Sequence, residues 1–173
     1  MLLLCTFNFC KAQDTTILLS PSMFGQTSQE IIISQMDGWL FKEGNDTSWA
    51  GKIIDNTGWK KLKPTELTAK YADKNGRAEG WFRLKLKLDT SFGDMPLQYR
   101  ILTWAAADLY ADGNLQIFYG NTEQNGAPFR ESSVNNYSAT AVKLKPGNEI
   151  TIAIHMVDYL SPFPPRRLKS EDE

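Results

Sequence analysis

The residues whose types could support catalysis are few in this chain of 173 residues. It has one histidine, His155, within the segment EITIAIHMV at 149–157. A histidine acting as a general base needs a positioned partner, and the sequence shows no second histidine or paired carboxylate near it. Gly-x-Ser-x-Gly, His-Glu-x-x-His and P-loop motifs are also missing from the sequence. We therefore predict a surface or sheet histidine and no enzymatic activity.

Aspartates beside tryptophans form a second group that could be read chemically. Asp46 and Asp55 resemble glycosidase carboxylates, but aspartate is also a common turn residue because its side chain accepts hydrogen bonds from nearby backbone N–H groups. A structural role is the stronger interpretation for both. Asp46, Asp55 and Asp94 show no spacing typical of calcium ligands, so we predict neither a metal nor a cofactor.

Both cysteines, Cys5 and Cys10, lie in the apolar run LLLCTFNFC at 2–10. This run has the length of a signal-peptide core and is too short to span a bilayer. Cys10-Lys11-Ala12 fits a cleavage site, which predicts a signal peptide over residues 1–12 and a secreted or periplasmic protein. A buried N-terminal strand is the alternative. A mature chain starting near Gln13 would contain no cysteine, which excludes disulfides, thiolate zinc sites and a cysteine nucleophile.

Aromatic residues are numerous, with five tryptophans and six tyrosines. Trp39, Trp49 and Trp59 are expected to pack at the edge of the fold. Trp81 and Trp104 alternate with apolar neighbours and are expected in an exposed or inter-sheet position. Other candidates sit in or near a long loop at 121–136, which is rich in Asn, Gly and Ser, although incidental loop aromatics are an alternative. The ligand-binding candidates are Trp81, Trp104, Phe129, Arg130 and Tyr137.

Strict alternation identifies the clearest strand, EGWFRLKLKL at residues 79–88. Apolar side chains occupy every second position from Phe82 to Leu88, and cationic side chains lie between them. A second strand is predicted at 149–157. Asp112-Gly113 lies between two apolar runs and predicts a two-residue hairpin turn.

Weaker patterns complete the expected fold. We predict strands at 30–34, 38–42 and 97–104, the last pairing antiparallel with 79–88, and one short helix at 64–73. A turn is expected from Asp55 to Trp59. Many short strands with little helix indicate an all-β antiparallel sandwich, and a jelly roll would place eight strands in two sheets.

Composition indicates one globular domain over 13–160, followed by a proline-containing charged linker or tail at 161–173. Hydrophobic residues make up 42% of the chain and charged residues 23%, with a net charge of −1. Basic residues are interspersed with acidic ones, so the sequence gives no sign of nucleic-acid binding.

Several segments together resemble galactose-binding-like jelly-roll domains. They are WLF at 39–41, WAGKIIDNTGW at 49–59, GWFR at 80–83, LYADG at 109–113 and LKPGNEI at 144–150. The resemblance covers residues 38–157 and assigns structural roles to Trp39, Trp49, Asp55, Trp59, Asp112 and Gly113. Many such domains carry a structural calcium.

Within this superfamily, the chain is similar to two groups. The first is the extracytoplasmic sensor domain of bacterial membrane histidine kinases, and the second is the sugar-binding domain of family 2 glycoside hydrolases. The resemblance implies a non-catalytic sensor that binds a small molecule, with a carbohydrate as one candidate, and that acts with C-terminal transmembrane and signalling domains. An accessory sugar-binding domain and a structural partner-binding sandwich remain alternatives.

Overall fold

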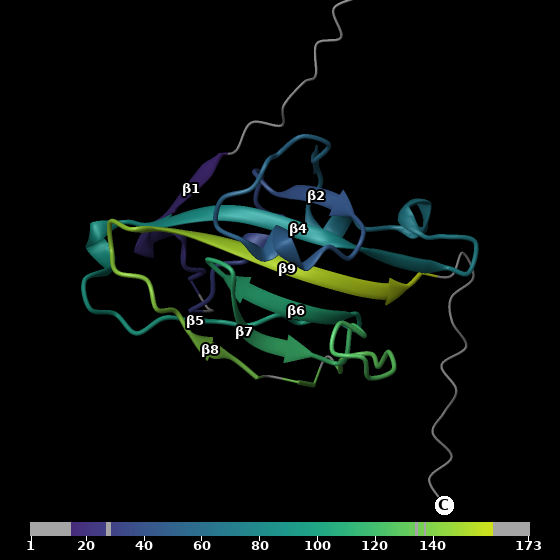
Figure 1. The fold of residues 1–173 in the computed structure, drawn as a ribbon. Coiled ribbons are helices and arrows are strands. Elements are labelled where there is room, and N and C mark those ends of the chain that lie inside the picture. Colours follow the sequence, from purple (N-terminus) through teal and green to yellow (C-terminus); the bar gives the residue numbers. More distant parts are fainter. Residues whose placement is uncertain (1–14, 27–28, 134, 137, 161–173) are drawn as a thin grey trace, which may run out of the picture.

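The computed structural model describes residues 15–26, 29–133, 135–136 and 138–160. Its fold is an all-β sandwich with unequal layers: a seven-stranded, mostly antiparallel sheet and a two-stranded sheet (Figure 1). The strands are β1 Thr16–Leu19, β2 Leu40–Glu43, β3 Lys60–Lys61, β4 Arg77–Leu88, β5 Gln98–Tyr99, β6 Ala106–Ala111, β7 Asn114–Tyr119, β8 Thr140–Ala141 and β9 Glu149–Tyr159. The described helices are short 3-10 turns: η1 Pro21–Met23, η2 Ile33–Gln35, η3 Thr47–Ala50, η4 Pro64–Glu66, η5 Ala69–Tyr71 and η6 Thr90–Phe92.

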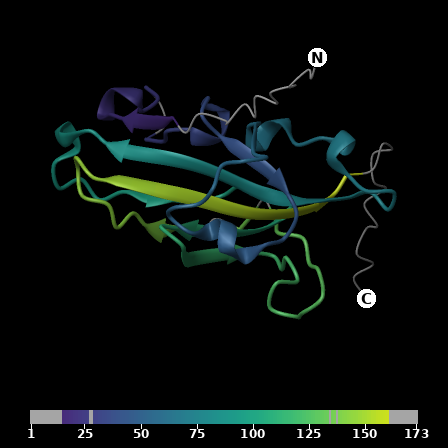
Figure 2. The same ribbon diagram turned by 45° about the horizontal axis from the view of Figure 1, so that its top comes forward.

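The large sheet is built around β4 and β9, the two longest strands, which pair antiparallel over their whole length. Its order is β3-β2-β4-β9-β6-β7, and β1 lies parallel to the C-terminal half of β4. The strands predicted at 79–88 and 149–157 are therefore confirmed. Figure 2 shows this pair running side by side through the middle of the molecule.

The face of the large sheet that β5 and β8 cover is here called the inner face. Paired residues in neighbouring strands point to the same side, and one such row crosses the sheet at Phe41, Phe82, Ile154, Leu109 and Ile117. Leu84, Leu86 and Leu88 continue this face along β4, and all three are buried. Alternation in the sequence thus located the core correctly.

The opposite face, the outer face, is also largely buried. Residues 44–59 fold over it, and Leu40, Ala50, Trp59, Trp81 and Ala153 form a second apolar cluster there. Arg83 is buried as well because its guanidinium donates hydrogen bonds to the carbonyl oxygens of Trp49 and Lys52. The cationic side of β4 therefore faces solvent only near its C-terminal end, where Lys87 is exposed.

Two predicted turns are confirmed. Asp112 and Gly113 both have positive φ, at 47° and 84°, and join β6 to β7, as expected for an Asp-Gly hairpin. Asp112 also accepts a hydrogen bond of 2.9 Å from the Thr151 backbone N–H. In the second turn, Asp55 accepts hydrogen bonds from the backbone N–H and the hydroxyl of Thr57.

Three other predictions need correction. Residues 30–34 contain no strand; this run of three isoleucines leads instead into η2, and isoleucine runs alone do not fix an extended backbone. The helix expected at 64–73 is two separate 3-10 turns, η4 and η5. Only Gln98 and Tyr99 of the segment 97–104 form a strand, and they pair with β8 in the small sheet, because β2, β1 and β9 already occupy the edges of β4.

The predicted signal peptide at 1–12 and the predicted tail at 161–173 lie outside the described residues, as does Tyr137. Within the described ranges, no helix has the length and apolarity needed to cross a membrane.

Candidate functional site

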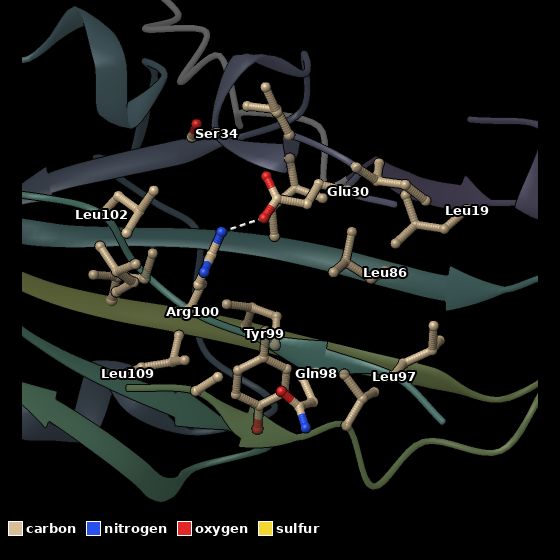
Figure 3. Close-up of a pocket in the computed structure, with 18 of the residues that line it drawn as sticks. Leu19, Glu30, Ser34, Leu86, Leu97, Gln98, Tyr99, Arg100, Leu102 and Leu109 are labelled. Atoms are coloured by element: carbon tan, nitrogen blue, oxygen red, sulfur yellow. Dashed lines mark hydrogen bonds and ion pairs between the residues drawn. The ribbon is translucent and has the colours of Figure 1, made fainter. Parts of the chain in front are cut away.

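A cavity of about 1250 Å³ lies between the inner face of the large sheet and the segments that cover it. Aliphatic side chains from β4, β9 and β6 form its floor, including Leu86, Ile152 and Leu109. Three segments form its cover: residues 29–34, 95–103 and 139–144. Figure 3 shows the leucines of the floor and cover converging on this space from different parts of the chain.

The cavity exists because the two layers differ in size. β5 and β8 contribute only two residues each, so loops cover most of the inner face of the seven-stranded sheet. Tyr119 anchors the cover: its hydroxyl accepts a hydrogen bond of 3.0 Å from the Ile101 N–H and donates one of 2.8 Å to the carbonyl of Ser138, which directly precedes the segment 139–144. Tyr119 is fully buried and does not line the cavity, so it holds the cover from outside that space.

An ion pair joins two of the cover segments. The Arg100 guanidinium donates to a carboxylate oxygen of Glu30, and both residues line the cavity (Figure 3). The side chains are 34% and 51% exposed, respectively, which places the pair where the cavity meets solvent. Asp158 is another acidic residue of the lining, and burial raises the pKa of its carboxyl. The site therefore combines an aliphatic interior with charged groups, of which one pair lies at the opening.

A second polar cluster lies on the outer face, around His155. Its Nε2 is 3.2 Å from Glu79 Oε1, its Nδ1 is 3.8 Å from Asp108 Oδ2, and its ring stacks on Trp81. His155 is completely buried, so a substrate in solvent has no access to its ring. This arrangement fits the predicted sheet histidine.

The predicted ligand-binding residues that the structure describes, which leave out Tyr137, do not line the cavity. Trp81 is completely buried between Tyr110 and His155, because residues 44–59 cover the outer face; its expected exposed or inter-sheet position is wrong. Trp104 is exposed, which is one of the two positions, exposed or inter-sheet, that we expected for it. Phe129 packs edge-on against Tyr159, and the backbone of Arg130 pairs with Asn121.

The residues given structural roles pack as expected where the structure describes their contacts. Trp39 is buried and donates a hydrogen bond of 2.9 Å to the Ile33 carbonyl. Trp49 and Trp59 form an edge-to-face pair with centroids 5.7 Å apart. Asp46 accepts a hydrogen bond from the Ser48 N–H, and the hydrogen bonds from Ser48 lower the pKa of its carboxyl. Both Asp46 and Asp55 thus serve turns.

Sequence reasoning missed the cavity and its Glu30–Arg100 pair. Glu30 begins the predicted strand at 30–34, and Arg100 lies within the predicted strand at 97–104, 70 residues away. The sequence signal for this cover was the alternation of Leu97, Tyr99 and Ile101, whose side chains all pack against the main core. No local pattern could indicate that this contact leaves a large volume beneath it.

Comparisons with known proteins give little further information. No protein-family model matches the chain, and no curated protein matches it significantly. Among solved structures, the chain is similar to a β-glucuronidase from Faecalibacterium prausnitzii, with a TM-score of 0.44 and 16% sequence identity. The match covers 70% of this chain and 20% of the enzyme, so the chain spans about a fifth of that enzyme's length.

Proposed function

We propose that this protein is a non-catalytic module that binds a small, largely apolar ligand in the cavity beneath residues 95–103. The observation that carries the proposal is the combination of the cavity's size with its aliphatic lining. Protein interiors are normally packed as densely as organic crystals, with few voids larger than a water molecule. A cavity of this volume therefore favours the interpretation that a ligand occupies it.

The chemistry of the lining supports this reasoning. Most of the residues around the space are apolar, and water is a poor partner for aliphatic walls. A ligand with substantial apolar surface would recover the missing contacts, at about 25 cal/mol per Å² of apolar area buried.

Binding can be measured with linear alcohols, because they test the cavity without involving charge. Octanol, decanol and dodecanol would be titrated by competition against a fluorescent naphthalene probe, after the protein has been stripped of co-purified lipid. Each buried methylene contributes about 0.8 kcal/mol, so two added carbons should tighten binding about fifteenfold. No binding by any of the three alcohols would contradict the proposal.

Two neighbouring residues at the end of β8 provide a matched pair of variants. Val142, directly after β8, lines the cavity, whereas Ala141 is exposed. Val142→Trp should weaken alcohol binding by filling the space, and Ala141→Trp should leave it unchanged. Equal effects of the two substitutions would indicate that the probe binds elsewhere.

The wider role that we propose is that of an extracytoplasmic sensor domain. The apolar run at 2–10, with its cleavage motif, supports transport out of the cytoplasm, and the resemblance of residues 38–157 to galactose-binding-like sensor domains supports signalling. Sensing requires that free and bound states differ in their contacts, and the loop-built cover is the part most able to change. Hydrogen exchange with and without dodecanol should show protection concentrated at 95–103; protection spread evenly over the chain would contradict a cover that responds to ligand.

A carbohydrate ligand is the alternative that the same resemblance implies. Sugar sites use exposed aromatic faces together with polar side chains, and Trp104 is the exposed tryptophan best suited to stacking. A thermal-shift screen with mono- and oligosaccharides would test this alternative. A sugar that raises the melting temperature in the wild-type chain but not in Trp104→Ala would favour it over the apolar ligand.

A further inference from the structure

The charged groups of the lining indicate what kind of polar head group the ligand carries and where that group lies. This inference rests on the proposed function. Arg100 is the one cationic residue among the described lining residues, and it lies where the cavity opens to solvent. We propose that the ligand is a single-chain amphiphile whose carboxylate pairs with Arg100 while its aliphatic part occupies the cavity.

Arg100 is well suited to receive such a head group. A guanidinium presents five N–H donors in a planar fork that matches the geometry of a carboxylate. Glu30 is the more exposed member of the ion pair that it forms with Arg100, at 51% against 34%. Exposed ion pairs of this kind contribute only about 0 to 1 kcal/mol, so a ligand carboxylate can compete with Glu30, which water would then solvate.

The positive charge of Arg100 also reaches the buried side of the cover. Burial raises the pKa of the Tyr119 hydroxyl, while the hydrogen bond with the Ile101 N–H and the charge of Arg100 both act in the opposite direction. Tyr119 is fully buried, so the guanidinium exerts its field inside the protein as well as toward solvent.

Asp158, the acidic lining residue outside the Glu30–Arg100 pair, disfavours an anionic head group at its own position. Asp158 lines the cavity, and burial already disfavours its charged form. A ligand carboxylate near Asp158 would add a like charge in a poorly solvated place, which is unfavourable. Attraction by Arg100 and the poor solvation around Asp158 therefore act in the same sense and orient the aliphatic chain of the ligand with its head at the opening.

The test compares three ligands with the same chain and different heads: dodecanoate, dodecanol and dodecylamine, below their micelle-forming concentrations at about pH 8, where the acid is ionised. Dodecanoate should bind most tightly to the wild-type protein. Arg100→Gln should weaken dodecanoate binding about tenfold more than it weakens dodecanol binding, which is the smaller end of the range for hydrogen bonds to charged groups. Glu30→Gln is the matched control: it removes the competing carboxylate and should leave dodecanoate binding equal or tighter.

The possible outcomes separate this inference from the proposed function. If dodecylamine binds most tightly and Glu30→Gln weakens it, the head group is cationic and the carboxylate inference is overturned. If all three ligands bind equally and neither variant changes them, the inference fails while the apolar cavity remains a binding site. If none of the three binds, the proposed function itself fails.

Discussion

Leu84 and Leu86 form a matched pair that tests whether the cavity exists in solution. Both lie on the inner face of β4, two residues apart, and they are 1% and 6% exposed. Leu86 lines the cavity, whereas Leu84 packs close to Gly38, where an added Cβ would lie 3.4 Å from Leu84 Cδ1. The two substitutions to alanine therefore remove the same atoms from differently packed surroundings.

The magnitudes follow from the contacts that each side chain has to lose. Buried leucine-to-alanine substitutions destabilise proteins by about 2.7 to 5.0 kcal/mol, with the larger values where a new void cannot collapse. Leu84→Ala should fall near the top of this range, at about 4 to 5 kcal/mol. Leu86 already borders a space without protein atoms on one side, so it has fewer dispersion contacts to lose, and Leu86→Ala should cost about 3 kcal/mol.

Urea unfolding of the ligand-free protein, followed by tryptophan fluorescence, would measure both free energies of unfolding. The expected difference of about 1 to 2 kcal/mol corresponds to a gap of roughly 2 to 8 °C in melting temperature for a chain of this size. Unchanged m-values would show that both variants unfold from equally compact states. Equal costs, or a larger cost at Leu86, would refute the reasoning and indicate that the cover packs tightly onto the sheet.

Three further predictions concern the framework around the cavity. Gly80→Ala should destabilise the protein by about 1 to 3 kcal/mol, because its Cβ would lie 2.6 Å from Phe41 Cε2 and 2.7 Å from the Lys42 carbonyl oxygen; an unchanged urea midpoint would contradict this. Arg83→Met should cost about 1 to 3 kcal/mol by leaving the carbonyls of Trp49 and Lys52 without their donor, and trypsin should then cut faster after Lys52 than in wild type. Hydrogen bonds from Ser91 hold the pKa of Asp89 below its ordinary value of 3.8, so this contribution to stability is complete above pH 3.8 and is lost as pH falls through the lowered value. Melting temperatures measured from about pH 5 to pH 2 should therefore fall less steeply for Asp89→Asn than for wild type.

The parts of the fold that the sequence predicts correctly are those whose evidence is local. β4 and β9 follow from every-other-residue apolarity, and the β6–β7 hairpin follows from the positive φ angles that Asp112-Gly113 can adopt. The partner of 97–104 was wrong because alternation defines which face is apolar and carries no information about the neighbouring strand. Trp81 was misplaced for a related reason: a loop distant in sequence covers its face.

Local sequence patterns predict the candidate site even less well than they predict the fold. Glu30 and Arg100 meet only because two loops cross above the same sheet, and the volume below them reflects the mismatch between a wide layer and a narrow one. Single-residue chemistry could identify aromatic and basic candidates, but it could not bring together residues from three strands and three cover segments. The His155 interpretation fared better because it depended on the strand itself.

The position of β9 has a consequence for how the molecule is made. It lies between β4 and β6, so these strands acquire their shared neighbour only after residues 149–159 have left the ribosome. Until then, the backbone edges of β4 and β6 that pair with β9 have no partner strand. Pairing over such long separations in sequence is slow. We expect nascent chains of this protein to depend on chaperones that shield exposed strands until residues 149–159 have left the ribosome.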